Sequence, residues 1–356
     1  MTELPSPLTA RGTSRGRLAR RRAVALGTLL VVAGAIALVT LATLHVIHLR
    51  STAPPPAPPP VVHHKGQTTA SAPISVSRVG TLTTAVAYAA AEPLPGGGAL
   101  IFGGLDSANT PLAAEQSFNG SHTGSGGTLP APLSGERAAL LGGSIYLFGG
   151  AGTSGPTGDI VTIASGGAGT IVSSLPQPTT DAASARVGDT AYIIGGSTGS
   201  ADIASIVAYT PNVGSRTVAS LPQPLEGAAG TAFNGEVYVI GGANGNATLN
   251  TIYRFDPASA TVTKVASLPV GLTHAAAVVS GTRIVIVGGE RTVAGDQTSS
   301  IFGFTPATRK VRQLGTLPAQ LSGVATVSDP GGVLVLGGVS QNGQTNATIY
   351  QIRLTA

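Results

Sequence analysis

The chain has 356 residues, of which 50 are glycine, 25 are proline and none is cysteine, and charged residues make up only 10%. This composition is too apolar for a disordered protein and too rich in glycine for a helical one, so it favours many short strands joined by turns. The absence of cysteine excludes disulfides, thiolate metal sites, cysteine nucleophiles and lipidation on cysteine.

The first 22 residues carry the whole net charge of the chain. They contain six arginines and one acidic residue, Glu3, which gives +5, the formal charge of the complete sequence. A nucleic-acid-binding domain needs its basic charge on a folded surface, where it displaces counterions from phosphates. We therefore expect no nucleic-acid partner, and we interpret residues 1–22 as a cytoplasmic basic tail.

Residues 23–49 are predicted to form one transmembrane helix. They contain no acidic residue, lysine or arginine, and Arg22 and Arg50 bound them. A helix of this length measures about 40 Å, against roughly 30 Å for the hydrocarbon core of a bilayer. A cleaved signal peptide or a twin-arginine export signal would have a shorter apolar region. An uncleaved anchor is favoured.

The arginines also predict the orientation of this anchor. Six precede the apolar run and one follows it, so the N-terminus is expected in the cytoplasm. The protein is then a single-pass protein of the cell membrane, with everything beyond the helix outside the cytoplasm. Residues 50–73, with two runs of three prolines, are expected to form an extended linker between the membrane and the following domain.

Residues 74–356 contain six repeats. Each has a hydrophobic run that ends in two glycines, at spacings of 46 to 49 residues, and a second marker, leucine usually followed by proline, keeps the same period. The glycine pairs are Gly103–Gly104, Gly149–Gly150, Gly195–Gly196, Gly241–Gly242, Gly288–Gly289 and Gly337–Gly338, and the marker leucines are Leu82, Leu129, Leu175, Leu221, Leu268 and Leu317.

Each repeat is expected to form four short strands, as in a blade of a β-propeller. The first strand consists of small residues, which suits the crowded wall of a central channel. The second is uninterruptedly apolar, which suits burial between neighbouring blades. The glycines are expected where blades approach closely and Cβ atoms would clash. The sixth repeat lacks a fourth strand, so Ile74–Leu82 is expected to complete it and to close the ring.

The aromatic residues strengthen this interpretation. Tyrosine occurs in the strand before the glycine pair (Tyr146, Tyr192, Tyr238), and an aromatic residue occurs in the strand after it (Tyr209, Tyr253, Phe302, Tyr350). Together with the glycine pairs, this pattern resembles the kelch repeat family over about residues 74–356. Arg137 and His274 match the basic residue that the family places near the first strand, whereas the family's tryptophan in the fourth strand is missing here. The resemblance implies an all-β, six-bladed kelch-type β-propeller.

The resemblance also implies which chemistry to consider. Galactose oxidase, a kelch-like enzyme, holds copper partly through a tyrosine linked to cysteine. Because this chain has no cysteine, and only His122 and His274 lie in the predicted propeller, we expect neither copper nor another metal or cofactor. The sialic acid mutarotases, which are also kelch-like, need only an acid/base group and charged anchors for the substrate.

The candidate ligand-binding residues are Glu136, Arg137, Asp181, Glu226 and His274. They precede or begin the first strands of four consecutive blades, so they are expected around the mouth of the central channel. Opposite charges there would suit a sugar or a carboxylate. Arg137 is the candidate for an anionic group, and Glu226 and His274 are candidates for sugar hydroxyls or proton transfer. The alternative is that these residues are solvated loop tips.

Three functions remain open from the sequence. The favoured one is an extracytoplasmic module, tethered to the membrane, that binds a protein or carbohydrate ligand on one propeller face. The others are a carbohydrate-active isomerase resembling the sialic acid mutarotases, and a structural scaffold of the cell envelope. No paired-carboxylate spacing, nucleophile motif, phosphate loop or metal-ligand cluster occurs in the sequence, which favours binding over catalysis.

Overall fold

The computed structural model describes residues 74–163 and 168–355. All regular secondary structure in these residues is β, and no helix among them is long and apolar enough to cross a membrane. The predicted basic tail (1–22), transmembrane helix (23–49) and proline-rich linker (50–73) lie outside the described residues.

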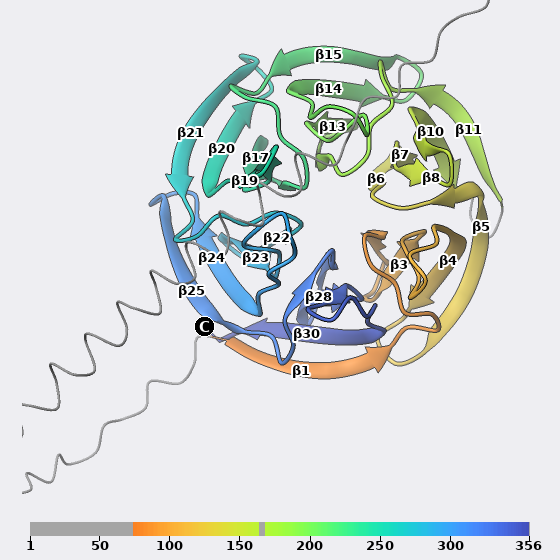
Figure 1. The fold of residues 1–356 in the computed structure, drawn as a ribbon, viewed down its shortest axis with the longest axis vertical. Helices are drawn as coiled ribbons and strands as arrows, with labels where there is room; N and C mark the ends of the chain where they lie inside the picture. The colour runs from red at the N-terminus through yellow and green to blue at the C-terminus, as the bar shows by residue number, and fades with distance from the viewer. Residues whose placement is uncertain (1–73, 164–167, 356) are drawn as a thin grey trace, which may run out of the picture. The chain divides into compact units, whose positions relative to one another are not determined.

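Six four-stranded antiparallel sheets surround a central axis (Figure 1). This is the six-bladed propeller that the repeats predict. From the inner to the outer edge, blades 1 to 3 consist of β2 (Ala90–Pro93), β3 (Ala99–Phe102), β4 (Leu112–Phe118) and β5 (Thr123–Leu133); β6 (Arg137–Leu141), β7 (Ser144–Phe148), β10 (Asp159–Ile163) and β11 (Gly169–Ser174); and β12 (Ala183–Val187), β13 (Thr190–Ile194), β14 (Ser205–Thr210) and β15 (Gly214–Ser220).

The other three blades have the same order of strands. They consist of β16 (Ala229–Phe233), β17 (Glu236–Ile240), β20 (Thr251–Asp256) and β21 (Thr261–Ser267); β22 (Ala276–Ser280), β23 (Arg283–Val287), β24 (Ser300–Thr305) and β25 (Lys310–Thr316); and β27 (Ala325–Asp329), β28 (Gly332–Leu336), β30 (Thr348–Leu354) and β1 (Ile74–Thr81). Three two-stranded pairs flank the blades: β8 (Ala151–Gly152) with β9 (Gly155–Pro156), β18 (Ala243–Asn244) with β19 (Ala247–Thr248), and β26 (Leu321–Ser322) with β29 (Val339–Ser340).

Blade 6 contains both ends of the described chain. β1 pairs with β30 in antiparallel register, from Ile74 opposite Leu354 to Thr81 opposite Thr348. The expected closure of the ring by Ile74–Leu82 is therefore confirmed. A propeller closed in this way presents no open sheet edge between its first and last blades.

The hydrophobic core lies between the blades. The second strands carry much of this core; β17 and β23, for example, are buried at every position except the first. One apolar cluster joins Tyr238 and Ile240 of blade 4 to Ile284 and Phe304 of blade 5. Because both faces of a middle strand pack against neighbouring blades, its sequence shows no alternation of polar and apolar residues.

The direction of the strands defines two faces. The second strand of each blade ends at a glycine pair. We call the face at which these six strands end the diglycine face. β1 is antiparallel to β30, which is antiparallel to β28. β1 therefore runs in the same direction as β28, toward the diglycine face. It follows that Ile74, where the described chain begins, lies at the opposite face.

The structure explains the glycine pairs. The N–H of the second glycine in each pair donates a hydrogen bond to a carbonyl of the segment that leads into the next blade, at 2.8–2.9 Å in all six repeats. A Cβ on the first glycine would overlap that same carbonyl oxygen, as at Gly241 and Leu272. The predicted close approach is thus confirmed, and the neighbour that requires glycine is a backbone oxygen.

Replacing Gly241 by alanine is expected to unfold or strongly destabilise the propeller. The new Cβ would meet the carbonyl of Leu272, and backbone on both sides prevents relief, so the cost should reach about 3 kcal/mol or more. Gly245 is the matched control, because its φ of 56° is equally left-handed but nothing lies within 4 Å of its Cβ position. Gly245→Ala should cost only about 1 kcal/mol. Equal melting temperatures of the two variants would contradict the steric explanation.

Candidate functional site

A closed ring of backbone hydrogen bonds surrounds the channel axis at the diglycine face. Its members are Tyr88, Gly135, Asp181, Gly227, His274 and Gly323. Each donates its N–H to the carbonyl of the ring residue in the preceding blade, and blade 1 donates to blade 6, with all six distances between 2.7 and 3.0 Å. We refer to these six residues as the ring. They clasp all the blades at one level through the main chain.

All six ring residues have a left-handed backbone. Their φ angles lie between 51° and 67°, a region that is unfavourable for residues with a side chain. Glycine nevertheless alternates with Tyr88, Asp181 and His274. A Cβ on Gly323 would meet the Tyr88 ring. One on Gly227 would meet the Thr273 hydroxyl and then the His274 ring, and one on Gly135 the Thr180 hydroxyl and then the Asp181 carboxylate. Each large side chain therefore covers the glycine of the preceding blade, so only every second position can carry one.

His274 lies among aromatic and acidic groups. Its ring is edge-on to Tyr88, with centroids 5.2 Å apart, and its Nδ1 is 3.9 Å from a carboxylate oxygen of Glu290. Glu290 also accepts hydrogen bonds from Ser322 Oγ at 2.6 Å and from Tyr88 Oη at 3.3 Å. Burial, reinforced by the charge of Glu290, raises the pKa of the Tyr88 hydroxyl, which therefore remains a hydrogen-bond donor.

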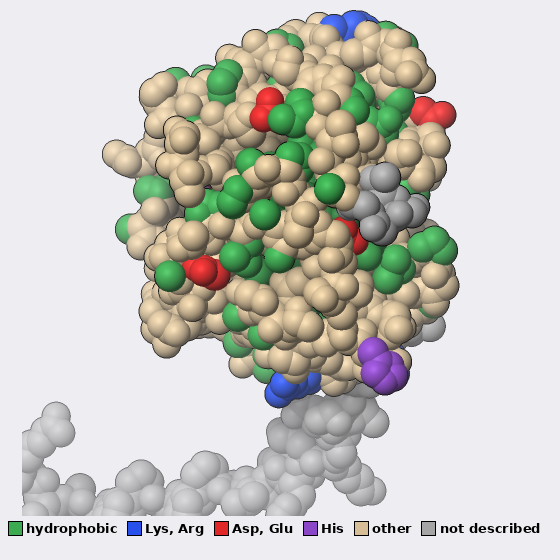
Figure 2. Space-filling view, turned by 90° about the vertical axis from the view of Figure 1, so that its right-hand side faces the viewer, with side chains coloured by type: hydrophobic (Ala, Val, Ile, Leu, Met, Phe, Trp, Pro, Cys, Tyr) green, Lys and Arg blue, Asp and Glu red, His purple; other side chains and the backbone are tan. Residues whose placement is uncertain are grey.

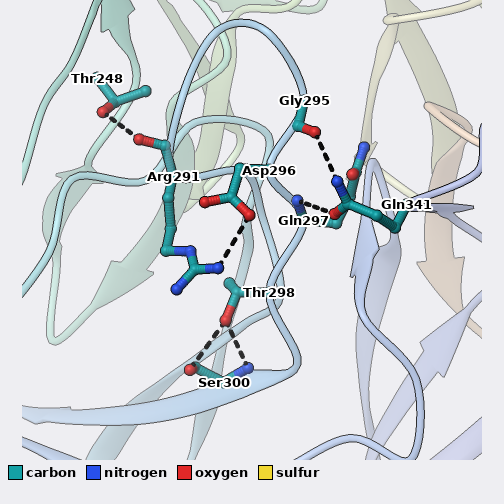
Figure 3. A network of polar contacts seen from close by, with 8 residues as sticks. All are labelled: Thr248, Arg291, Gly295, Asp296, Gln297, Thr298, Ser300 and Gln341. Carbon is teal, nitrogen blue, oxygen red and sulfur yellow. Dashed lines mark hydrogen bonds and ion pairs between the residues drawn. The ribbon is translucent and has the colours of Figure 1, made fainter. Parts of the chain in front are cut away.

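The loop after Glu290 is held between two neighbouring blades (Figure 3). Thr248 Oγ1 of blade 4 donates to the Arg291 carbonyl at 2.8 Å. On the other side, the amide of Gln341 in blade 6 accepts from Gln297 N at 2.9 Å and donates to the Gly295 carbonyl at 3.1 Å. These contacts fix the backbone that carries Glu290.

Glu226 extends the acidic side of the mouth. It immediately precedes Gly227 of the ring, where the other blades have alanine, serine or threonine. Burial raises the pKa of its carboxyl, the negative charges of Asp202 and Asp181 raise it further, and His274 opposes them. The charges of Asp181 and His274 therefore act on Glu226 from nearby.

Arg137 lies one level below the ring. It begins β6 and, among small residues of the inner strands, lines a cavity of about 130 Å³ in the central channel. Its Nε donates to the carbonyl of Ala182, and its Nη1 donates to that of Glu136 at 3.0 Å. Burial lowers the pKa of the guanidinium, whereas the Asp181 and Glu136 carboxylates raise it. The alanine-rich channel wall agrees with the expectation for the first strands.

Glu136 is fully buried, at 0% exposure. The Ala90 N–H reaches its Oε1 at 3.4 Å, and its Oε2 has no hydrogen-bond partner among the described residues. Burial raises the pKa of its carboxyl to about 7, despite the nearby N–H groups and Arg137. The equivalent residue of every other blade is alanine or valine, so a carboxyl here is a departure from the repeat.

The five predicted residues thus occupy different levels. Asp181, Glu226 and His274 lie at the channel mouth, Arg137 lines the channel below it, and Glu136 is enclosed. The resemblance suggested that Arg137 and His274 occupy equivalent positions, but they do not. His274 is a ring residue, whereas Arg137 follows the ring residue of its blade by two positions. Tyr146 packs against Tyr209. Tyr192 and Tyr238 pack against Phe255 and Phe304, which lie two positions after Tyr253 and Phe302.

Sequence reasoning missed Tyr88, Glu290 and Ser322 as parts of this site. A signal for Tyr88 was present, because every ring residue lies six positions after the marker leucine of its repeat. The contact between Glu290 and Ser322 joins loops of two blades, so no spacing within a repeat reports it. The described residues contain no group of three or more histidine, aspartate or glutamate side chains placed to hold a metal ion.

Comparisons with known proteins support the repeat and the fold. A family model described as Kelch motif matches residues 224–269, which include all four strands of blade 4. A solved structure titled "Structure of YjhT" is 14% identical, with a TM-score of 0.67 over 77% of this chain and 96% of that chain. No curated protein sequence matches the chain. At this level of identity, the structural likeness establishes the fold alone.

Glu136 should make the stability of the propeller depend on pH. Its pKa is about 7 in the folded state, against an ordinary value of 4.5. Stability is therefore greatest when the carboxyl is protonated and falls as the pH rises from about 4.5 to 7. Between pH 5 and 8, the unfolding free energy of Glu136→Gln should fall by about 2 kcal/mol less than that of the natural sequence. Denaturant titrations at both pH values measure it, with the exposed Asp189→Asn as the control; an unchanged loss would contradict the assigned pKa.

Proposed function

The chain is a six-bladed kelch-type β-propeller, and we propose that it is a membrane-tethered module that binds a carbohydrate at its diglycine face. The observation that carries this proposal is the ring. It fixes Asp181 and His274 around the channel axis, and Glu226 and Glu290 come from the adjoining loops. A rigid frame limits the entropy that a ligand loses when it orders the side chains it contacts.

The chemistry of the mouth supports a ligand rich in hydroxyl groups. Carboxylates accept hydrogen bonds from sugar hydroxyls, and the imidazole and the Tyr88 hydroxyl can donate or accept. Arg137 lies below them and suits an acidic substituent that reaches into the channel. The buried core of a protein–protein interface is enriched in aromatic and other apolar side chains. The exposed large hydrophobic side chains of the described residues are few, and Figure 2 shows hydrophobic groups scattered over one side of the propeller.

The membrane anchor belongs to the same proposal. The apolar run of residues 23–49 and the arginines before it support a single-pass protein of the cell membrane with a cytoplasmic N-terminus. The described chain enters the propeller at Ile74, on the face opposite the glycine pairs.

An isomerase is the second candidate, and one observation favours it. Burial and two neighbouring carboxylates raise the pKa of Glu226, which also interacts with His274. A carboxyl of raised pKa beside an imidazole suits proton transfer to and from a sugar hydroxyl. An assay for sugar mutarotation tests it directly, and acceleration that is lost in Glu226→Gln would establish this function. The third candidate, a scaffold of the cell envelope, has no site-specific support.

Binding can be tested on a glycan array with the full-length chain in detergent. We expect at least one glycan to bind, and Glu226→Gln with His274→Asn to weaken it at least about tenfold. Asparagine is chosen because it tolerates the left-handed backbone of residue 274. The matched control is Asp189→Asn, an exposed carboxylate on the turn between β12 and β13. No binding at all, or equal binding of the double variant, would contradict the proposal.

The topology can be tested with protease added to intact spheroplasts. Because the propeller and its linker are expected outside the cytoplasm, protease should digest them while a cytoplasmic control protein survives. The protein should remain in the membrane fraction with its N-terminal tail intact. A protected full-length chain would reverse the proposed orientation, and a mature N-terminus near residue 45 would establish a cleaved signal instead.

A further inference from the structure

A groove between blades 1 and 2, on the face opposite the glycine pairs, differs from the other grooves between blades. It encloses about 560 Å³, which lies within the usual range for small-molecule pockets, roughly 300–1,000 Å³. Apolar side chains line most of it, among them Leu100, Leu140, Ile145 and Ile163. It lies on the other face from the ring and shares no residue with that site.

An aromatic pair that fills three other interfaces is missing from this groove. In three neighbouring interfaces, a tyrosine of the second strand meets an aromatic residue of the next blade's third strand, with centroids 5.4–5.7 Å apart. Between blades 1 and 2, Leu100 occupies the tyrosine position, three residues before the first glycine. Ile163 occupies the position of the partner, because it pairs with Ile145 as Tyr209 pairs with Ala191.

Two other grooves between blades are smaller. The groove between blades 4 and 5, which Tyr238 and Phe304 line, encloses about 260 Å³. The groove between blades 6 and 1, where Leu334 faces Phe118, encloses about 300 Å³. With two aliphatic side chains at these positions, the groove between blades 1 and 2 is about twice as large. Aliphatic side chains at these positions do not open a groove by themselves, because Val285 and Ile352 occupy them between blades 5 and 6 and are fully buried.

The charges in this groove are also unbalanced. Between blades 4 and 5, Glu236 pairs with Arg254 at 2.9 Å, and between blades 6 and 1, Asp329 shares the lining with Arg353. The groove between blades 1 and 2 has two carboxylates, Glu92 and Glu115, and no lysine, arginine or histidine among its described lining residues. The cation that completes the other two grooves is missing from this one.

We propose that the groove between blades 1 and 2 binds an amphipathic amine, with its ammonium group facing Glu92 and Glu115 and its apolar part against Leu100 and Ile163. The aliphatic wall favours the apolar part through the hydrophobic effect, and a partly buried carboxylate interacts more strongly with a cation than an exposed one does. This site requires no residue of the ring and is independent of any carbohydrate bound there.

The ionisation of Glu92 provides a further signature. Burial raises the pKa of its carboxyl to about 7, and the charge of Arg186 on β12 opposes this effect. The other carboxyl that lines the groove is that of Glu115 on β4, which accepts the Gly127 N–H at 3.2 Å. A bound ammonium group favours the ionised form of Glu92, so affinity for the amine should rise between pH 5.5 and 8.

The test uses 4-phenylbutylamine as the probe and 4-phenylbutan-1-ol as its uncharged analogue, titrated calorimetrically into the full-length chain in detergent at pH 8. The amine should bind at least about tenfold more tightly than the alcohol. In Glu92→Gln with Glu115→Gln, this difference should fall below about threefold and the pH dependence should disappear. Asp189→Asn, the exposed carboxylate used as a control above, should leave both affinities unchanged.

A second variant checks the location. Leu100→Tyr with Ile163→Tyr recreates the Tyr146–Tyr209 pair of the next interface, so the protein should fold with an unchanged or higher melting temperature and lose binding of both probes. The same variant corrects for partition of the probes into detergent. Absence of amine binding by the natural sequence, equal affinity for amine and alcohol, or full affinity in the filled variant would each overturn the proposal.

Discussion

The close contact of neighbouring backbones is the constraint on which this propeller depends. At each interface, a carbonyl oxygen of one blade lies where a Cβ of the preceding blade would be, and it accepts a hydrogen bond from the next N–H. Only glycine permits that approach. The repeated glycine pair is therefore a packing requirement, and it places the inner ends of all six blades close enough to join through the main chain.

The ring of backbone hydrogen bonds is the direct consequence of that approach. It holds the backbone of three residues with side chains, Tyr88, Asp181 and His274, in a left-handed conformation that costs free energy. That cost is spread through a structure closed by the β1–β30 pairing, in which no blade can relax alone. A strained residue on a rigid frame is a common property of binding and catalytic sites, because the surroundings fix the side chain before a ligand arrives.

The two faces use the repeat in different ways. At the diglycine face, side chains added at alternate ring positions give an acidic mouth around His274. At the opposite face, the interface between blades 1 and 2 lacks the aromatic pair that fills the next three interfaces along the chain. In both places, the candidate site contains residues that differ from those at the same position of the other repeats, where the residues only pack. Glu136, a buried carboxyl where other blades have alanine or valine, follows the same rule.

The amino-acid pattern of the repeats was sufficient to predict the fold. The period of 46 to 49 residues, the apolar second strands and the glycine pairs report local and nearest-neighbour packing, which every repeat has in common, and the closing strand followed from the one repeat that lacked it. Other features became visible only in the folded structure. They are the levels of Arg137, Glu136 and His274 in the channel, the contact of Glu290 with Ser322, and the open groove at Leu100. Each depends on which side chain of one blade faces which backbone of the next, and a pattern within one repeat contains no such information.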